Sequence, residues 1–282
     1  MKVIRNPKKI NKLLKGLAAK GKSIGFVPTM GALHLGHLSL IKQAEKENDI
    51  VVVSIFVNPR QFGPQEDLSQ YPRPLKNDLL LCRKAKVDLV LLPDEKIMYP
   101  EGFATFVNVE KLGDILCGAT RSGHFRAVTT VVAKLLNIVT PNVLYLGQKD
   151  AQQSVIITRM IKDLNFPVKI RVLPTLRQKD GLALSSRNVY LNADQKLEAV
   201  VLFKALCLAK SLIDHGQRDV SRIINRMKEL ISKKQQAKID YIAIVDLEKL
   251  KKIKKINQDC LICLAVKIGK TRLIDNLVIT YN

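Results

Sequence analysis

Two histidines three residues apart are the clearest candidates for chemistry in this chain. His34 and His37 stand in the sequence Pro-Thr-Met-Gly-Ala-Leu-His-Leu-Gly-His, residues 28–37, which follows a short apolar run. An apolar-periodic stretch at residues 38–47 comes next, so the predicted order is strand, glycine-bearing loop and helix. Backbone N–H groups and the helix dipole favour an anion at such a helix start. Spacing alone leaves two interpretations open, phosphate handling and ordinary surface or core histidines.

Three further segments carry side chains that could do chemistry. The first, residues 56–63, supplies Asn58 and Gln61, whose amides could bind hydroxyls or a carboxylate without adding charge. It comes directly after a long apolar run and would therefore lie at the end of a strand. Asn-Pro within it is also a common turn former, so ordinary turn chemistry is the alternative.

The other two segments add cationic groups. Residues 147–153 place Lys149 and Asp150 where a strand gives way to a helix, so the lysine could meet a polyphosphate and the aspartate could cap the helix. Residues 180–188 contain two serines followed by Arg187, whose planar guanidinium can bind phosphate through two hydrogen bonds. A plain serine-rich turn remains the alternative for this last segment.

Length and composition set the outer limits. The 282 residues suffice for one or two domains with a substantial core, and 47% hydrophobic with 26% charged residues is typical of globular proteins. No apolar run approaches the roughly 20 residues of a membrane helix. The basic N-terminus lacks the apolar region of a signal peptide. We therefore expect a cytoplasmic protein with no membrane partner.

The formal net charge of +22 could indicate a nucleic-acid partner. The basic residues are scattered, however, and tryptophan is absent while aromatic residues make up only 5% of the chain. Base-stacking platforms are therefore not evident. Solvated lysine faces are the preferred interpretation, so no nucleic-acid partner is expected, although some of the charge could favour an anionic substrate.

The five cysteines form no convincing disulfide framework. Cys260 and Cys263 have the spacing of redox and zinc sites, but they fall in a predicted strand without a second ligand pair. A buried pair of strand cysteines is the better interpretation.

Apolar runs and helical patterns alternate through the first 175 residues. Predicted strands are 24–27, 50–57, 87–92, 143–146 and 168–173, and predicted helices are 38–47, 75–84, 124–138 and 151–165. Continuous apolar runs are typical of parallel strands buried on both faces, so we predict an α/β fold, a Rossmann-like doubly wound parallel sheet. Ligands then bind at the carboxyl ends of the strands.

A second, smaller α+β domain is predicted for residues 176–282, after a first domain at 1–175. Its expected helices are 195–215 and 220–234, and its expected strands are 239–245, 261–268 and 272–279. We find no internal repeat or low-complexity linker in the chain.

Taken together, the four segments resemble one family. Residues 28–37, 56–62, 147–153 and 180–188 closely match the ordered motifs of the pantothenate synthetases, also called pantoate–β-alanine ligases. Shorter matching stretches lie at 71–73, 98–100, 121–125 and 272–276, so the resemblance spans nearly the whole chain. The His-x-Gly-His element alone is less specific, because nucleotidylyltransferases and class I aminoacyl-tRNA synthetases share it.

The resemblance implies an ATP-dependent ligase that acts in two steps. Pantoate attacks the α-phosphate of ATP to give pantoyl adenylate and pyrophosphate, and the amine of β-alanine then releases pantothenate and AMP. Positioning and charge neutralisation would dominate such chemistry. The resemblance also implies Mg²⁺ with the ATP, no covalent enzyme intermediate and a homodimer.

The same resemblance assigns the site residues. The catalytic set would be His37, His34, Lys149 and Arg187, with His37 as proton donor or, equally well, as electrostatic stabiliser. Gln61 and Gln153 would hold pantoate, and Gln61 would also lie near β-alanine. The ATP site would comprise Met30, Gly31, Ala32, Leu33, His34, Leu35, Gly36, His37, Gly147, Gln148, Lys149, Asp150, Leu176, Leu184, Ser185, Ser186 and Arg187. Arg121 is a weaker candidate near the active site.

Two departures and two rival functions accompany this assignment. Leu35 occupies a position that is often glutamate in the family. Asn77 and Asp78 stand where some members have two acids, which leaves the protein ligands of Mg²⁺ open. The rivals are a nucleotidylyltransferase that stops after transferring AMP and an RNA-binding module suggested by the charge.

Overall fold

The computed structural model describes residues 1–64 and 66–281, which divide into two compact units. The first unit comprises Met1–Gly147 and Ile156–Pro174, and the second comprises Gln148–Val155 and Thr175–Asn282. The short segment Gln148–Val155 therefore groups with the C-terminal part of the chain, although the residues on either side of it belong to the first unit.

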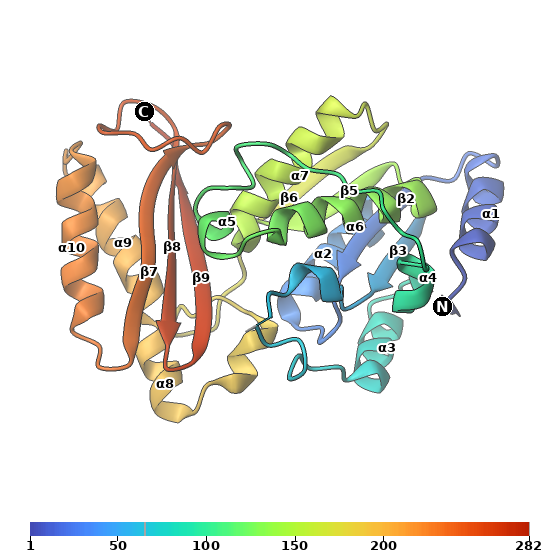
Figure 1. The fold of residues 1–282 in the computed structure, drawn as a ribbon, viewed down its shortest axis with the longest axis horizontal. Helices are drawn as coiled ribbons and strands as arrows, with labels where there is room; N and C mark the ends of the chain where they lie inside the picture. The colour runs from blue at the N-terminus through green and yellow to red at the C-terminus, as the bar shows by residue number, and fades with distance from the viewer. Residues whose placement is uncertain (65, 282) are drawn as a thin grey trace. The chain divides into compact units, whose positions relative to one another are not determined.

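The first unit is built around a parallel sheet of six strands (Figure 1). The strands are β1 Lys2–Ile4, β2 Ile24–Thr29, β3 Ile50–Ile55, β4 Leu89–Leu91, β5 Val143–Gly147 and β6 Lys169–Leu173. The helices between them are α1 Pro7–Ala18, α2 Leu35–Glu47, η1 Pro59–Gln61, α3 Leu75–Lys84, α4 Glu95–Met98, α5 Cys117–Thr120 and α6 His124–Val139. After β5 come η2 Gln148–Asp150 and α7 Ala151–Asp163.

The order of the strands makes the sheet doubly wound. They lie in the order β1-β4-β3-β2-β5-β6, and every pair is parallel. Following the chain, the sheet grows from β2 toward β3 and β4 and then restarts on the other side of β2 with β5 and β6. This reversal confirms the predicted Rossmann-like fold and puts the switch point between β2 and β5, where ligands bind in open α/β sheets.

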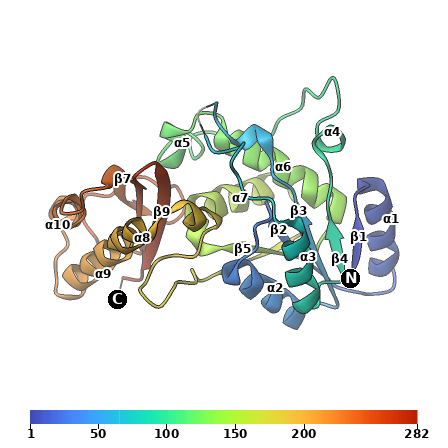
Figure 2. The same ribbon diagram turned by 90° about the horizontal axis from the view of Figure 1, so that it is seen from below.

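Successive residues of β2 explain how both faces of the sheet are covered. Phe26 packs with α1, α6 and α7 in one apolar cluster, whereas Val27 packs with α2 and α3 in another. Neighbouring strand residues point to opposite faces, so a continuous apolar run needs helices on both sides. Figure 2 shows α2 and α3 on one side of the strands and α6 and α7 on the other.

Pro28 limits the pairing of β2 at its carboxyl end. The β2–β5 ladder contains only Gly25 with Val143 and Phe26 with Leu144, whereas β2–β3 pairing continues to Thr29. Proline has no N–H to donate to a ladder, so the strand cannot bond on both sides beyond this point. The end of β2 is therefore released from β5 at the switch point.

The second unit is an antiparallel sheet of three strands with helices packed against it (Figure 1). Its strands are β7 Ala237–Asp246, β8 Cys260–Ile268 and β9 Thr271–Ile279, and its helices are η3 Ser186–Tyr190, α8 Ala193–Ala199, α9 Val201–Asp214 and α10 Val220–Ser232. Apolar residues of α9 and α10 share one core with alternate residues of the strands. This confirms the smaller α+β region.

The helices bury one face each. In α1, only Ile10 and Leu14 are fully buried, and lysines occupy much of the remaining surface. A surface helix held by such a narrow apolar stripe gains its stability from packing rather than from propensity. No helix in the described part of the chain is long and apolar enough to cross a membrane.

Two local expectations were wrong, and both errors have a physical cause. The first strand expected along the chain is 24–27, but β1 comes before it, so the strand that precedes the His-bearing turn is the second in chain order. Strand β1 has only three residues and therefore gives no periodic signal in the sequence. The single helix expected at 195–215 is two helices, because α8 ends at Ala199 and α9 begins at Val201. An unbroken apolar pattern cannot reveal such a break.

The cysteines behave as the sequence predicted. Cys260 and Cys263 are both buried in β8, and all five cysteines are free thiols. Burial is the main cause that raises the pKa of Cys82 to about 12 and that of Cys260 to about 11. Cys207 is exposed on α9.

Gly25 offers a test of how tightly β2 is packed. A Cβ atom there would lie 2.7 Å from Asn48 Nδ2 and 3.2 Å from Tyr145 Cε2. Overpacking of this kind costs about 1–3 kcal/mol, so Gly25→Ala should lower the free energy of unfolding by that amount in a urea titration. Gly16→Ala is the matched control, since nothing lies within 4 Å of its Cβ position in α1. The control should gain about 0.4–1 kcal/mol, and equal effects of the two variants would contradict this account.

Candidate functional site

The turn after β2 is fixed by backbone hydrogen bonds to buried oxygens. Thr29 Oγ1 donates to the carbonyl of Ser54 at 2.7 Å and accepts the N–H of Gly31 at 3.1 Å. Gly31 and Ala32 then have φ angles of +80° and +49°. The second is unusual for a residue with a Cβ, so the surrounding contacts must hold the turn in shape.

Asp78 supplies the contact that holds the turn. Its two carboxylate oxygens accept the N–H groups of Ala32 at 2.9 Å and Leu33 at 2.8 Å. The residue is only 1% exposed. Burial raises the pKa of Asp78, while the two backbone hydrogen bonds act in the opposite direction. The carboxylate thus satisfies two N–H groups of the strained turn in a place that water does not reach.

His34 and His37 hold each other's backbone at the start of α2. The N–H of Gly36 donates to His34 Nδ1 at 3.1 Å, and the N–H of His34 donates to His37 Nδ1 at 3.3 Å. The arrangement is a capping box in which imidazoles take the usual place of serine and glutamate. An Nδ1 that accepts a hydrogen bond cannot carry the proton, so the neutral rings carry it on Nε2.

This tautomer decides what the two rings can do. Their centroids are 4.1 Å apart, and both present an Nε2–H donor at the positive end of a helix. Two neighbouring N–H donors at a helix start suit the oxygens of a phosphate. The geometry therefore favours hydrogen bonding to a developing negative charge and does not require an imidazolium.

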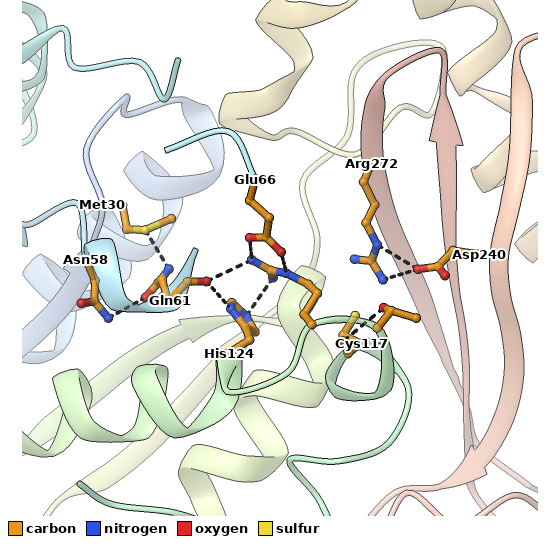
Figure 3. Close-up of polar contacts among 10 residues, drawn as sticks. Met30, Asn58, Gln61, Glu66, Cys117, His124, Asp240 and Arg272 are labelled. Atoms are coloured by element: carbon orange, nitrogen blue, oxygen red, sulfur yellow. Dashed lines mark hydrogen bonds and ion pairs between the residues drawn. The ribbon is translucent and has the colours of Figure 1, made fainter. Parts of the chain in front are cut away.

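Gln61 is positioned by a chain of buried polar groups (Figure 3). Its Oε1 accepts from Asn58 Nδ2 at 3.2 Å, and its Nε2 contacts Met30 Sδ at 2.8 Å. Asn58 is 1% exposed and accepts the Tyr99 hydroxyl at 2.8 Å. Burial raises the pKa of Tyr99 to about 12, which keeps that hydroxyl protonated and donating. The contact between Gln61 and Met30 thus joins the segment at residues 56–63 to the His-bearing turn.

A second network fixes the backbone of Gln61. Arg121 donates both Nε and Nη2 to the carboxylate of Glu66 at 2.6 Å, and Nη2 also reaches the Gln61 carbonyl at 3.3 Å. His124 contacts the same carbonyl through Nδ1 at 2.8 Å (Figure 3). Burial alone would raise the pKa of Glu66, but the Arg121 hydrogen bonds and charge outweigh it, so the pKa is lowered.

His124 completes this network through its other ring nitrogen. The Gln61 carbonyl can only accept, so His124 Nδ1 carries the proton and Nε2 accepts from Arg121 Nη1 at 2.9 Å. Arg121, only a weak candidate from sequence, therefore supports Gln61.

In the second unit, the segment after β5 is held by β9. Asn276 Nδ2 donates to the carbonyls of Gln148 and Lys149, each at 2.9 Å, and its Oδ1 accepts from Gln148 Nε2 at 3.0 Å. The Lys149 side chain is half-buried and lies 3.4 Å from Asp150. Gln153 follows, half-buried, in the first turn of α7.

The serine–arginine segment is the end of a small hairpin. Leu184 N–H donates to the carbonyl of Leu176 at 3.0 Å, and Arg177 forms an antiparallel bridge with Ala183. Ser185 then caps the short helix η3, because its Oγ accepts the N–H of Arg187 at 3.3 Å. The half-buried residues Leu184, Ser185, Ser186 and Arg187 follow one another along this turn.

The predicted site residues therefore fall into two groups. Residues 30–37 and Gln61 belong to the first unit and contact each other at Met30, whereas residues 148–153 and 184–187 belong to the second. Sequence reasoning missed the roles of Asp78, Glu66 and His124. For two of these three it had a usable signal, because Asp78 follows the Tyr71 stretch and His124 lies in the matching stretch 121–125.

Comparison with known proteins decides the family. A model of the pantoate–β-alanine ligase family matches residues 2–278. The chain belongs to the pantoate–β-alanine ligase family. Two proteins named pantothenate synthetase, from Thermosipho africanus and Fervidobacterium nodosum, are 52% and 53% identical to it over 279 residues. Each alignment covers 99% of this chain and 99% or more of the relative.

Solved structures agree with this membership. A pantothenate synthetase from Thermus thermophilus superposes with a TM-score of 0.94 at 43% identity, covering 98% of this chain and 99% of that one. A pantoate–β-alanine ligase from Francisella tularensis, complexed with β-γ ATP and β-alanine, gives a TM-score of 0.81 at 40% identity. That alignment covers 99% of this chain and 97% of the other. The likeness thus spans both units of the ligase fold.

Asp78→Asn tests the contact that holds the turn. The amide would turn an N–H toward a backbone N–H, leaving one buried donor unsatisfied, so the free energy of unfolding should fall by about 1–3 kcal/mol. Asn77→Ala, on the exposed face of the same helix, should stay within about 0.5 kcal/mol of the wild type. Denaturant titrations measure both values. An unchanged Asp78→Asn midpoint would mean that the turn keeps its shape without this carboxylate.

Proposed function

We propose that this chain condenses pantoate with β-alanine at the expense of ATP, forming pantothenate, AMP and pyrophosphate. Membership of the pantoate–β-alanine ligase family over residues 2–278 supports the overall reaction. The observation that supports the ATP-dependent half is the reciprocal capping of His34 and His37 at the start of α2, which fixes both imidazoles at a helix N-terminus, where phosphate oxygens bind favourably.

The first step forms the mixed anhydride. A carboxylate oxygen of pantoate attacks the α-phosphorus of ATP, a new O–P bond forms, and the bond to the bridging oxygen breaks as pyrophosphate leaves. Charge builds on the phosphate oxygens during this exchange, so donors that are already aligned are the main source of rate enhancement. His37 acts as such a donor through Nε2–H and need not lose its proton.

The second step makes the amide. The neutral amine of β-alanine attacks the acyl carbon of pantoyl adenylate, the bond from that carbon to the phosphate oxygen breaks, and AMP leaves. The nitrogen loses one proton, which passes to water. No covalent bond to the enzyme forms in either step, which suits a site rich in amides and cations. Correct placement of the two substrates is then the chief requirement.

The remaining residues bind and orient the substrates. Gln61 and Gln153 hold pantoate, and the rigid support of Gln61 by Asn58 and Arg121 suits an amide that must be aimed accurately. Lys149 and Arg187 neutralise the triphosphate, the lysine as a point charge and the arginine through paired hydrogen bonds. By the family resemblance, the first 175 residues would bind ATP and pantoate, and the smaller domain would add Arg187 and its neighbours.

We also propose that Mg²⁺ is carried by the triphosphate as part of the nucleotide substrate. No group of three or more His, Cys, Asp or Glu side chains among the described residues could hold a metal ion. Both carboxylate oxygens of Asp78 already accept backbone N–H groups. These residues do not fit a metal site held by the protein, whereas Mg²⁺ commonly keeps its waters and binds phosphate oxygens.

The family resemblance further supports a homodimer that works in the cytoplasm. Sedimentation velocity of the purified chain tests the first part, with a dimer as the expected species. A monomer that turns over at the full rate would remove the dimer from the proposal.

The reaction itself is tested by mass spectrometry. Pantoate, β-alanine and ATP together should give pantothenate, AMP and pyrophosphate in equal amounts. Without β-alanine, pyrophosphate release should stop after about one equivalent per site, because the adenylate stays bound. Accumulation of free pantoyl adenylate in the presence of β-alanine would favour the nucleotidylyltransferase alternative. Steeply salt-dependent RNA binding without ATP turnover would favour an RNA-binding module.

His37→Ala tests the donor role. Loss of one aligned donor should lower adenylate formation by about 10²–10³-fold, measured as pantoate-dependent exchange of pyrophosphate into ATP. The folded state should survive, since losing a cap costs about 1 kcal/mol. His215→Ala is the control, because that histidine caps the end of α9. Near-normal exchange in His37→Ala would remove His37 from the chemistry.

Arg187→Ala tests the phosphate clamp. Its main effect should be on the KM for ATP, raised by about tenfold or more through the loss of a charge-assisted contact. The exposed Arg226 of α10 provides the matched control, and Arg226→Ala should behave as wild type. Steady-state kinetics at varied ATP give both constants, and an unchanged KM for ATP would contradict the clamp.

A further inference from the structure

The dipeptide Asp275-Asn276 on β9 contains two of the few buried polar side chains in the second unit. Asp275 is 3% exposed and Asn276 is 4% exposed. Both lie in the stretch 272–276 that matches the family in sequence but has no part in the reaction described above. A buried carboxylate and a buried amide side by side are costly unless every oxygen and N–H is used, so their partners are informative.

Adjacent strand residues point to opposite faces of the sheet, and these two follow that rule. Asp275 is two residues from Leu273 and Leu277, which pack into the core shared with α9. Asn276 lies on the other face, where its amide meets the backbone of η2. One strand thus presents a polar group in each direction at the same level.

On the η2 face, Asn276 is matched to its surroundings atom by atom. Two carbonyl oxygens, of Gln148 and Lys149, can only accept, so they face the amide N–H groups at 2.9 Å. The amide oxygen takes the Gln148 side-chain N–H at 3.0 Å. This arrangement fixes the backbone on both sides of the Cα atom of Lys149.

On the helix face, Asp275 reaches the other loop through Arg177. Both terminal nitrogens of Arg177 donate to the Asp275 carboxylate, Nη2 at 2.9 Å, and Oδ1 also accepts the N–H of Asn276 at 2.8 Å. The guanidinium carbon of Arg177 lies 4.2 Å from the centre of the Phe203 ring. Arg177 is therefore held by a charge pair on one side and an aromatic ring on the other.

Arg177 in turn fixes the hairpin that leads to the serine–arginine segment. It bridges to Ala183, and its Nη1 donates to the Gly181 carbonyl at 3.2 Å. The hairpin lies close against Phe203 at this point, because a Cβ at Gly181 would fall 2.2 Å from the Phe203 ring. Asn188 then ties η3 back to the Ala183 carbonyl at 3.0 Å.

We propose that Asp275 and Asn276 are positioning residues that hold two loops at a fixed distance from each other. Asn276, on one face of β9, holds residues 148–150 (the Lys149 loop), and Asp275, on the other face, holds residues 185–187 (the Ser185–Arg187 loop). The inference rests on the proposed function, since it assigns both loops to the triphosphate. Neither residue touches the substrate. Each acts through another residue, Asn276 through the Lys149 backbone and Asp275 through Arg177.

Asn276→Asp is the decisive variant, because it keeps the size of the side chain and removes its N–H donors. Its carboxylate would face two carbonyl oxygens, so the Lys149 loop should move away. Misplacement of this order costs about 10–100-fold in rate, seen in pyrophosphate exchange and in kcat/KM for ATP. Asn192→Asp, at the N-cap of α8 in the same unit, is the matched control and should behave as wild type.

A double-mutant cycle separates positioning from general loss of stability. If Asn276 acts through Lys149, Asn276→Asp combined with Lys149→Ala should be within about threefold of Lys149→Ala alone, because the two changes remove one function. Multiplicative effects would overturn the proposal, as would a near-normal Asn276→Asp. Ile223→Ala, in the core of the same unit, should lower the melting temperature without changing the KM for ATP.

Arg177→Lys tests the other arm with a milder change. Lysine keeps the charge but cannot donate two parallel hydrogen bonds or stack flat on Phe203. It should raise the KM for ATP by about tenfold through the Ser185–Arg187 loop, and it should be non-additive with Arg187→Ala. If Asn276→Asp does not fold, this variant still tests the proposal through the Arg177 arm, and an unchanged KM for ATP would overturn it.

Hydrogen–deuterium exchange without any substrate makes the inference independent of the activity. Peptides that cover residues 147–153 should exchange at least about threefold faster in Asn276→Asp, and those that cover 182–190 should do so in Arg177→Lys. If the wild type formed no pantothenate but exchange changed in this way, the proposed function would fail and the positioning would stand. Unchanged exchange in both variants would overturn the positioning, whatever the enzyme makes.

Discussion

The place where the ladder between β2 and β5 stops is the constraint on which the carboxyl end of the sheet depends. Pro28 has no N–H to offer, so β2 pairs with β5 only as far as Phe26 while it continues along β3. In open α/β sheets, ligands bind at the carboxyl ends of the strands that flank such a switch point. The first of those ends leads into the His-bearing turn, and the second ends at Gly147.

Buried polar groups, each fully used, give the site its precision. Asp78 satisfies two N–H groups of a strained turn, Asn58 and Tyr99 orient the Gln61 amide, and Asp275 pairs with Arg177. Removing one member of such a set leaves another buried group without its partner, which costs more than the hydrogen bond itself contributes. The positions of the candidate site residues therefore depend strongly on these buried hydrogen-bond partners.

The sequence predicted most of the fold because the strands are continuous apolar runs and the helices are periodic. It could not predict β1, which is too short to show a pattern, or the break between α8 and α9. The motifs point to candidate site residues, but they do not point to the side chains that support them. Asp78 reaches a turn 46 residues earlier in the chain, and Asn276 reaches a loop 128 residues earlier. Contacts over such separations leave no local spacing to recognise, so they can be found only in the folded chain.

The distribution of the thiols has a practical consequence. Cys207 is exposed on α9, whereas the other four cysteines are buried, and burial raises the pKa of two of them to about 11 and 12. Maleimides react with the thiolate, so a brief reaction near neutral pH should attach one dye to the folded enzyme at Cys207. The natural sequence thus provides a single attachment point in the second unit, and fluorescence could follow that unit during turnover without any engineered cysteine.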